Sequence, residues 1–312
     1  MPSPDSATAG TQAPSAPDYG IAPPGYRLPA AARLGPVRLQ VADLARSLAY
    51  YERVLGLRVL PRGDRSAALG PEGEARVLVE LHERPGAAPV PRRGRLGLYH
   101  FAILLPERAA LGRLIRHLAE TGEHAGMSDH LVSEAVYLTD PDGLGIEVYA
   151  DRLRSAWRHE GRQLVMATEP LDVEGLVRAA GSEKWTGMPA GTVIGHVHLF
   201  VGDLEAAAAF YHAGLGLDKV VWSYPGALFL SAGGYHHHLG TNTWAARAAP
   251  AREDDARLLE WEVRVPAVAD ARAALASLAR AGVAVETAED GGVARDPWGT
   301  AVRVRGAQTA EP

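Results

Sequence analysis

The feature that most constrains the fold is an internal repeat with one constant spacing. A proline, two glycines and an aspartate that resembles a helix cap each recur 160 residues later, in the pairs Asp43 and Asp203, Gly56 and Gly216, Pro106 and Pro266, and Gly122 and Gly282. Two Asp-Pro-x-Gly turns, which begin at Asp140 and Asp296, lie 156 residues apart. One offset kept across unrelated landmarks indicates that the chain is two copies of one unit.

Each copy contains the same pattern of elements twice. Residues Val37 to Val41 alternate like a strand, Asp43 is typical of a helix N-cap, and the apolar helical stripe that follows ends at Gly56. Short strand-like segments come next. The pattern starts again at His100, Val197 and Trp261. We therefore predict an α+β chain of four βαβββ modules.

The domain boundaries follow from this repeat. An N-terminal segment rich in Ala and Pro has the composition of a disordered tail. The predicted division is a tail over 1–32, a two-module domain over 33–151, a linker over 152–192 with a short helix near Val173 to Ala180, a second two-module domain over 193–306, and a tail over 307–312.

Composition excludes several classes of function. The 312 residues include no cysteine, so any transition metal must be held by His, Asp or Glu. The formal net charge of −5 gives no sign of a nucleic-acid or membrane partner, and no apolar run reaches the ~20 residues that a membrane helix needs. We expect a cytoplasmic protein.

Five of the 12 histidines fall in two short segments of the second copy, namely His196 and His198 in the first and His236, His237 and His238 in the second. Imidazole is the commonest metal ligand in proteins and a natural proton carrier. If His236 to His238 lie on a strand, His236 and His238 share one face and His237 points the other way, because side chains alternate.

The four modules resemble the vicinal oxygen chelate superfamily, which includes glyoxalases and type I extradiol dioxygenases. Segments similar to bacterial catechol 2,3-dioxygenase-type proteins are Gly97 to Ala102, Ser128 to Ala135, Met166 to Asp172 and Gly233 to Gly240. The resemblance implies that the modules pair into two vicinal-oxygen-chelate domains with cup-shaped mixed sheets. It also implies that metal ligands come from first strands and late strands of modules.

Carried over to the second copy, this layout gives His196, His238 and Glu260 as the metal ligands. Two imidazoles and one carboxylate are a typical set for non-haem Fe(II), with Mn(II) as the alternative. Arg303 stands where the superfamily commonly has a carboxylate, so the usual order of His, His and late Glu is not kept in this copy.

The first copy offers a second set at the corresponding positions, namely Pro36, Glu80, His100 and Glu147. Pro36 has no ligand atom, but Glu80, His100 and Glu147 remain an open alternative for the metal site. The two imidazoles of the second copy favour it as the iron site.

The resemblance implies an extradiol ring-cleaving dioxygenase that acts on a catechol-like aromatic diol with O2, and that forms homo-oligomers as members of this fold often do. His236 and His198 are the candidates for acid–base catalysis. Two alternatives stay open: a glyoxalase-like metal-dependent isomerase or transferase without O2, and a metal-free small-molecule-binding protein.

Overall fold

The computed structural model describes residues 19–307, and within this range most strands fall into two mixed eight-stranded sheets. Sheet I has the order β12 (Asp218–Val221), β13 (Ala227–Ser231), β14 (Leu239–Asn242), β11 (Val193–Phe200), β5 (Gly97–Leu104), β8 (Gly145–Asp151), β7 (Ser133–Thr139) and β6 (Gly126–Asp129). Sheet II has the order β16 (Val285–Ala288), β17 (Gly291–Arg295), β18 (Ala301–Gly306), β15 (Arg257–Val265), β1 (Arg33–Val41), β4 (Val79–Glu83), β3 (Ser66–Gly70) and β2 (Arg58–Arg62). The predicted α+β fold with two curled sheets is confirmed.

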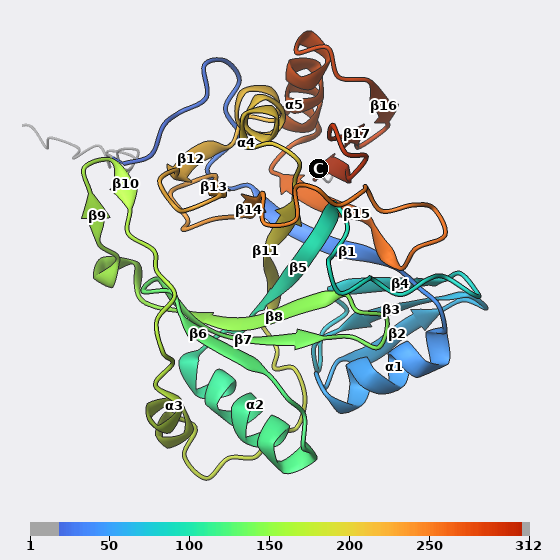
Figure 1. Ribbon diagram of the computed structural model, residues 1–312, viewed down its shortest axis with the longest axis vertical. Helices are drawn as coiled ribbons and strands as arrows, with labels where there is room; N and C mark the ends of the chain where they lie inside the picture. Colours follow the sequence, from blue (N-terminus) through green and yellow to red (C-terminus); the bar gives the residue numbers. More distant parts are fainter. Residues whose placement is uncertain (1–18, 308–312) are drawn as a thin grey trace, which may run out of the picture.

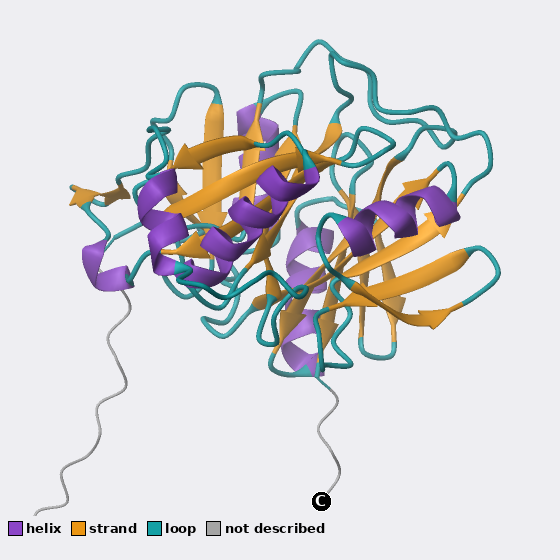
Figure 2. Cartoon of the chain, turned by 90° about the horizontal axis from the view of Figure 1, so that it is seen from below, coloured by secondary structure: helices purple, strands orange, loops and turns teal. Residues whose placement is uncertain are grey.

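The modules pair across the two halves of the chain. In sheet I the first strand of the second module, β5, runs antiparallel to the first strand of the third module, β11. In sheet II, β1 of the first module pairs in the same way with β15 of the fourth. Each sheet therefore contains one module from residues 33–151 and one from 193–306, whereas we expected each half to form its own sheet. Figure 2 shows the two groups of strands side by side, with helices across the face of each.

The repeat pattern does not distinguish the two pairings. The first strand of each module lies at one side of that module's own strands. Its outer edge therefore carries backbone donors and acceptors that need partners from another module. The first strand of any other module can satisfy that edge equally well, since all four are largely apolar strands in the same position of their module. The register of the repeat is therefore correct, but the choice of partner depends on tertiary packing.

The helices begin and end where the landmarks place them. They are α1 (Leu44–Arg53), α2 (Arg108–Thr121), α3 (Val173–Ala179), α4 (Leu204–Ala207), which continues into the π-helix η2 (Ala208–Gly214), and α5 (Val268–Arg280). The side chain of Asp43 accepts the backbone N–H of Arg46, and Asp203 caps Ala206 in the same way. Figure 1 shows α1 beside β2 and β3, and α2 beside β6 to β8.

The N-terminal segment differs from its prediction. Residues 1–18 lie outside the described range, but residues 19–32 are ordered against the second half of the chain. The backbone of Ile21 exchanges hydrogen bonds with Lys219 at the edge strand β12, and Leu28 is buried. Arg27 makes a two-pronged ion pair with Asp218. Composition alone suggested a tail, yet the open edge of β12 supplies backbone partners for it.

The linker contains the predicted short helix as α3, together with a 3₁₀ turn η1 (Arg154–Ala156) and a small hairpin of β9 (His159–Glu160) and β10 (Gln163–Leu164). Among residues 19–307, no helix has both the length and the apolar character needed to cross a membrane.

Candidate metal centre

Three neighbouring strands bring His196, Glu147 and His100 onto the concave face of sheet I. Ala102 of β5 lies opposite Glu147 of β8 on one side and opposite His196 of β11 on the other. His100 lies two residues before Ala102, so it shares the same face. The small side chain of Ala102 leaves the space between the two flanking strands open for the larger groups.

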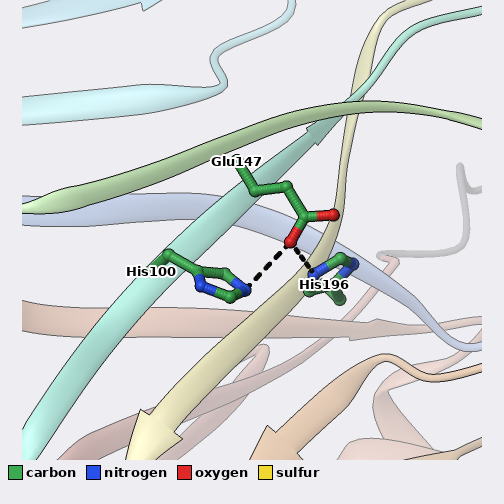
Figure 3. A group of neighbouring side chains, drawn as sticks. All are labelled: His100, Glu147 and His196. Carbon is green, nitrogen blue, oxygen red and sulfur yellow. Dashed lines mark hydrogen bonds and ion pairs between the residues drawn. The ribbon is translucent and has the colours of Figure 1, made fainter. Parts of the chain in front are cut away.

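The three side chains converge on one point, as Figure 3 shows. Glu147 Oε2 lies 3.0 Å from His100 Nε2 and 3.1 Å from His196 Nε2. One ligand atom from each residue lies within 4.8 Å of the other two, and all three residues are buried. The group combines two imidazoles and one carboxylate on one side of a point, with the other side free.

The unsatisfied polar atoms of this group fit a metal ion. Nε2 of His100, the ring nitrogen that faces Glu147, is buried and makes no hydrogen bond among the described residues, although it lies 3.0 Å from Oε2 of Glu147. Leaving such an atom unpaired costs about 1–3 kcal/mol. Two imidazoles with one carboxylate are the donor set of non-haem Fe(II) sites.

The charges at this point also favour a cation. Burial among other imidazoles lowers the pKa of His196 to about 4, which leaves it neutral as a ligand must be. Burial alone would raise the pKa of Glu147, but His196 and His100 outweigh it and hold that pKa well below its usual range. The centre thus carries one buried negative charge beside the neutral imidazole of His196.

A cavity of about 210 Å³ opens above the three residues. Its walls are mostly aromatic rings and imidazoles, and include Tyr99, His130, Tyr137, Tyr224, Phe229, Trp244, His198 and His237. A wider hollow of about 1210 Å³ shares Tyr99, His100, Tyr137 and Trp244 with it. Three exposed arginines and no carboxylate line that outer hollow, namely Arg92, Arg93 and Arg247.

The orientation of His198 is fixed by its neighbours. The backbone N–H of Trp244 donates to Oδ1 of Asn242 at 3.0 Å, so the amide nitrogen of Asn242 faces His198 Nε2, also at 3.0 Å. His198 Nε2 therefore accepts, and its proton lies on Nδ1. A side chain at Gly240 would come within 2.9 Å of the His198 ring, so glycine provides the space for it.

The sequence of this chain also matches the model of a known protein family. The model described as the Glyoxalase/Bleomycin resistance protein/Dioxygenase superfamily covers residues 33–148 and 193–304. The chain belongs to this superfamily. It is also 46% identical over 268 residues to a protein of Bacillus subtilis (strain 168) named catechol-2,3-dioxygenase, which covers 85% of this chain and 93% of that relative.

Solved structures support the fold alone. A putative dioxygenase from Bacillus subtilis subsp. subtilis str. 168 has a TM-score of 0.62 at 15% identity, with 90% of this chain and 86% of that chain covered. Glyoxalase I from Zea mays has a TM-score of 0.52 at 18% identity, with 88% and 92% covered.

The superfamily layout of two first-strand histidines and one late glutamate is present, but in sheet I. His100 and His196 lie on first strands and Glu147 on the last strand of a module. Because this cup joins the second and third modules, its three candidate ligands appear in the chain in the order His, Glu, His. The order hides the layout from a reading that takes each half as a separate cup.

The structure does not bring the expected ligands His196, His238 and Glu260 together. His238 lies outside the cavity, where its Nδ1 contacts the Ser231 hydroxyl and the Ala232 backbone N–H, each at 3.2 Å. Glu260 lies in sheet II. Of the expected metal set, only His196 reaches the centre.

The histidine run is not a strand, so alternation does not apply to it. β14 begins at Leu239, and the preceding residues form a turn in which Gly233 and Gly234 have left-handed backbone angles. His237 consequently lines the cavity, with its ring 4.1 Å from that of His196. His236 is fully buried behind it.

The equivalent cup of sheet II has no metal ligands of this kind at the corresponding positions. The repeat places Pro36 at the position of His196, Glu260 at that of His100 and Arg303 at that of Glu147. Arg303 makes a two-pronged ion pair with Glu260 at 2.6 and 3.0 Å. Arg38 bridges Glu260 at 3.0 Å and Glu80 at 2.7 Å.

Sequence reasoning missed the pair of His130 and Tyr137. His130 Nδ1 lies 2.8 Å from the carbonyl oxygen of Ala167, so it donates there, and Nε2 accepts from the Tyr137 hydroxyl at 2.6 Å. Tyr137 lies directly opposite Glu147 on the neighbouring strand. The signal available in the sequence was the position of Tyr137, ten residues before a ligand in a strand–turn–strand pattern.

Proposed function

We propose that the protein is an extradiol ring-cleaving dioxygenase that acts on a catechol-like aromatic diol with O2. The observation that carries this proposal is the buried group of His100, Glu147 and His196 beneath an aromatic-walled cavity. Its support comes from the 46% identity to a catechol-2,3-dioxygenase over most of both chains. His100, Glu147 and His196 would hold Fe(II), with Mn(II) as the alternative for the same donors.

The bound metal would supply a Lewis acid that lowers the pKa of a diol hydroxyl and leaves room for O2. The residues around it manage the protons and exclude water. His237 is positioned to accept a proton from the substrate, since its ring faces the cavity beside His196. The proton that His237 accepts is the one returned in the later protonation, while His198, with Nε2 occupied by Asn242, offers its Nδ1–H as a hydrogen-bond donor.

The walls of the cavity suit a flat ring. Phe229, Tyr224 and Trp244 provide aromatic surfaces around a volume of about 210 Å³. Arg92, Arg93 and Arg247 line the outer hollow without any acidic neighbour in its wall. We therefore propose that the preferred diols carry a carboxylate, because such a group would be attracted to this entrance.

The test is reconstitution of the metal-free protein with Fe(II), followed by an assay of ring cleavage. The purified protein is loaded with Fe(II) without oxygen, and a panel of catechols with and without carboxylate side chains is added before air. Stoichiometric O2 uptake with a yellow ring-fission product is expected, and His237→Asn should lower kcat by about 10²-fold or more. Full metal loading with no O2 uptake on any diol would overturn the proposal and favour a glyoxalase-like isomerase.

A further inference from the structure

A line of three hydrogen-bonding side chains runs from the rim of the molecule to the cavity. Asp151 ends β8, four residues after the ligand Glu147, and its side chain is 28% exposed. Its Oδ1 lies 2.9 Å from Nε2 of the fully buried His236. Nδ1 of His236 lies 2.8 Å from Nδ1 of His237, which lines the cavity.

Donors and acceptors along this line have only one consistent order when both imidazoles are neutral. A carboxylate oxygen only accepts, so His236 must carry its proton on Nε2. Nδ1 of His236 is then a bare lone pair and accepts the N–H on Nδ1 of His237. The remaining nitrogen of His237, Nε2, is left without a proton and makes no hydrogen bond to any residue within 19–307.

The surroundings hold this line in place. The Tyr235 hydroxyl donates to the same Asp151 oxygen at 3.2 Å, and Tyr149 donates to Tyr235 at 2.6 Å. The rings of Tyr149, Tyr235 and Trp157 enclose His236. A side chain at Gly195 would come within 1.8 Å of the Tyr149 hydroxyl, so glycine beside the ligand His196 admits this support.

We propose that Asp151 and His236 are positioning residues that fix His237 in the tautomer with a bare Nε2 toward the cavity. Without them, His237 can equally present an N–H there, which cannot accept a proton from a diol. The tautomer itself follows from hydrogen bonds within the chain, whereas its use in catalysis rests on the proposed dioxygenase function.

The first experiment reads the tautomer directly. The full chain is labelled with ¹⁵N-histidine, and imidazole ¹⁵N shifts are recorded for the metal-free protein and for the protein loaded with diamagnetic Zn(II). His237→Asn and His236→Gln assign the signals. In the native protein we expect a protonated Nδ1 and a bare Nε2 for His237. A protonated Nε2 of His237, with His236 protonated on both nitrogens, would overturn the proposal.

Two variants separate positioning from mere packing. Asp151→Leu removes the acceptor with similar bulk, and a mixture of His237 tautomers is expected. Tyr235→Phe removes the other donor to Asp151 but keeps the line, so the tautomer should stay as in the native protein. An unchanged His237 tautomer in a folded Asp151→Leu protein would contradict the proposal.

Kinetics provide the second readout. In the Fe(II)-loaded protein, Asp151→Leu should lower kcat by at least about 2-fold with KM and bound iron nearly unchanged, since an equal mixture of tautomers leaves half of His237 with a bare Nε2. If the native protein cleaves no diol but shows the expected tautomers, the proposed function fails while the positioning stands. If it cleaves diols and Asp151→Leu leaves kcat unchanged, the catalytic part of the inference fails.

Discussion

The two cups, cup I formed by sheet I and cup II formed by sheet II, share a scaffold and differ in chemistry. Both join the first strands of two modules antiparallel, and His198 faces His100 in one as Arg38 faces Glu260 in the other. In cup I the corresponding groups are imidazoles and a carboxylate that leave polar atoms unpaired. In cup II they are charged side chains that satisfy one another. The scaffold places the side chains, and their identity decides whether an ion is required.

Charge balance expresses this difference most simply. Cup II contains two arginines and two glutamates, namely Arg38, Arg303, Glu80 and Glu260, whose charges cancel. Cup I contains one ionised carboxylate, Glu147, beside the neutral imidazole of His196. A divalent cation would balance the charge of cup I, whereas the same ion in cup II would have to displace arginines from their carboxylates.

The largest expected effect comes from removing a ligand of cup I. His100→Ala and His196→Ala should each reduce bound iron from about one equivalent to a small fraction, and lower kcat/KM by more than about 100-fold, since a ligand matters at least as much as its supporting residues. Metal analysis after dialysis measures the first effect.

Matched substitutions in cup II and outside both cups serve as controls. Glu260→Gln and His238→Ala should keep a full equivalent of iron. Loss of iron in either of these variants, with retention of iron in His100→Ala, would show that the metal does not lie in cup I.

The next effect concerns the turn that precedes each late strand. Asp140 is buried, accepts the backbone N–H groups of Asp142 and Leu144, and burial raises its pKa to about 6 from 3.8. Because the folded state binds this proton more tightly, the stabilisation is present below about pH 4 and is lost as pH rises through 6. Asp140→Asn should remove about 2–3 kcal/mol of this pH dependence from the free energy of unfolding.

Urea unfolding from pH 4 to 7 measures that loss. Asp296, the equivalent aspartate before the late strand of cup II, has its pKa raised in the same direction by burial and accepts the Tyr211 hydroxyl at 2.9 Å. Asp296→Asn should therefore flatten the curve in the same sense. A steeper curve in either variant would contradict the sign.

The smallest effect is expected from opening the ion-pair network of cup II. Arg303→Met leaves Glu260 paired only with Arg38, and should cost about 1–3 kcal/mol of stability, since these groups are partly exposed. Thermal unfolding gives the size of the loss, while iron content and kcat should stay at native levels. A drop in iron that exceeds the loss of folded protein would mean that the two cups are coupled.

The sequence was sufficient for what depends on local chemistry. The caps Asp43 and Asp203, the left-handed glycine Gly56 and the helix after Val173 all follow from backbone requirements that one residue type meets. The four modules follow from the repeat of such landmarks. The layout implied by the family resemblance also identified His196, and it identified His100 and Glu147 within the alternative set that included Glu80.

What the sequence did not reveal depends on choices between equivalent partners. The sequence of β5 does not select β11 over another first strand as its partner. The sequence alone therefore could not predict that Glu147 and His196 lie side by side. The predicted direction of the His237 side chain was wrong because two left-handed glycines turn the chain just before it, so the run is not a strand. Asp151 had no signal of its own, since its partner lies 85 residues away.

Each half of the chain contributes one module to each sheet. Two identical subunits of a twofold-symmetric dimer would exchange modules in the same way, but here both halves belong to one polypeptide. In such a dimer of identical half-chains, both cups would necessarily carry the same residues, and every substitution would appear twice. Joining the halves through residues 152–192 removes that constraint. One cup is then free to keep an ion while the other becomes a self-sufficient structural support, and neither half contains a complete centre by itself.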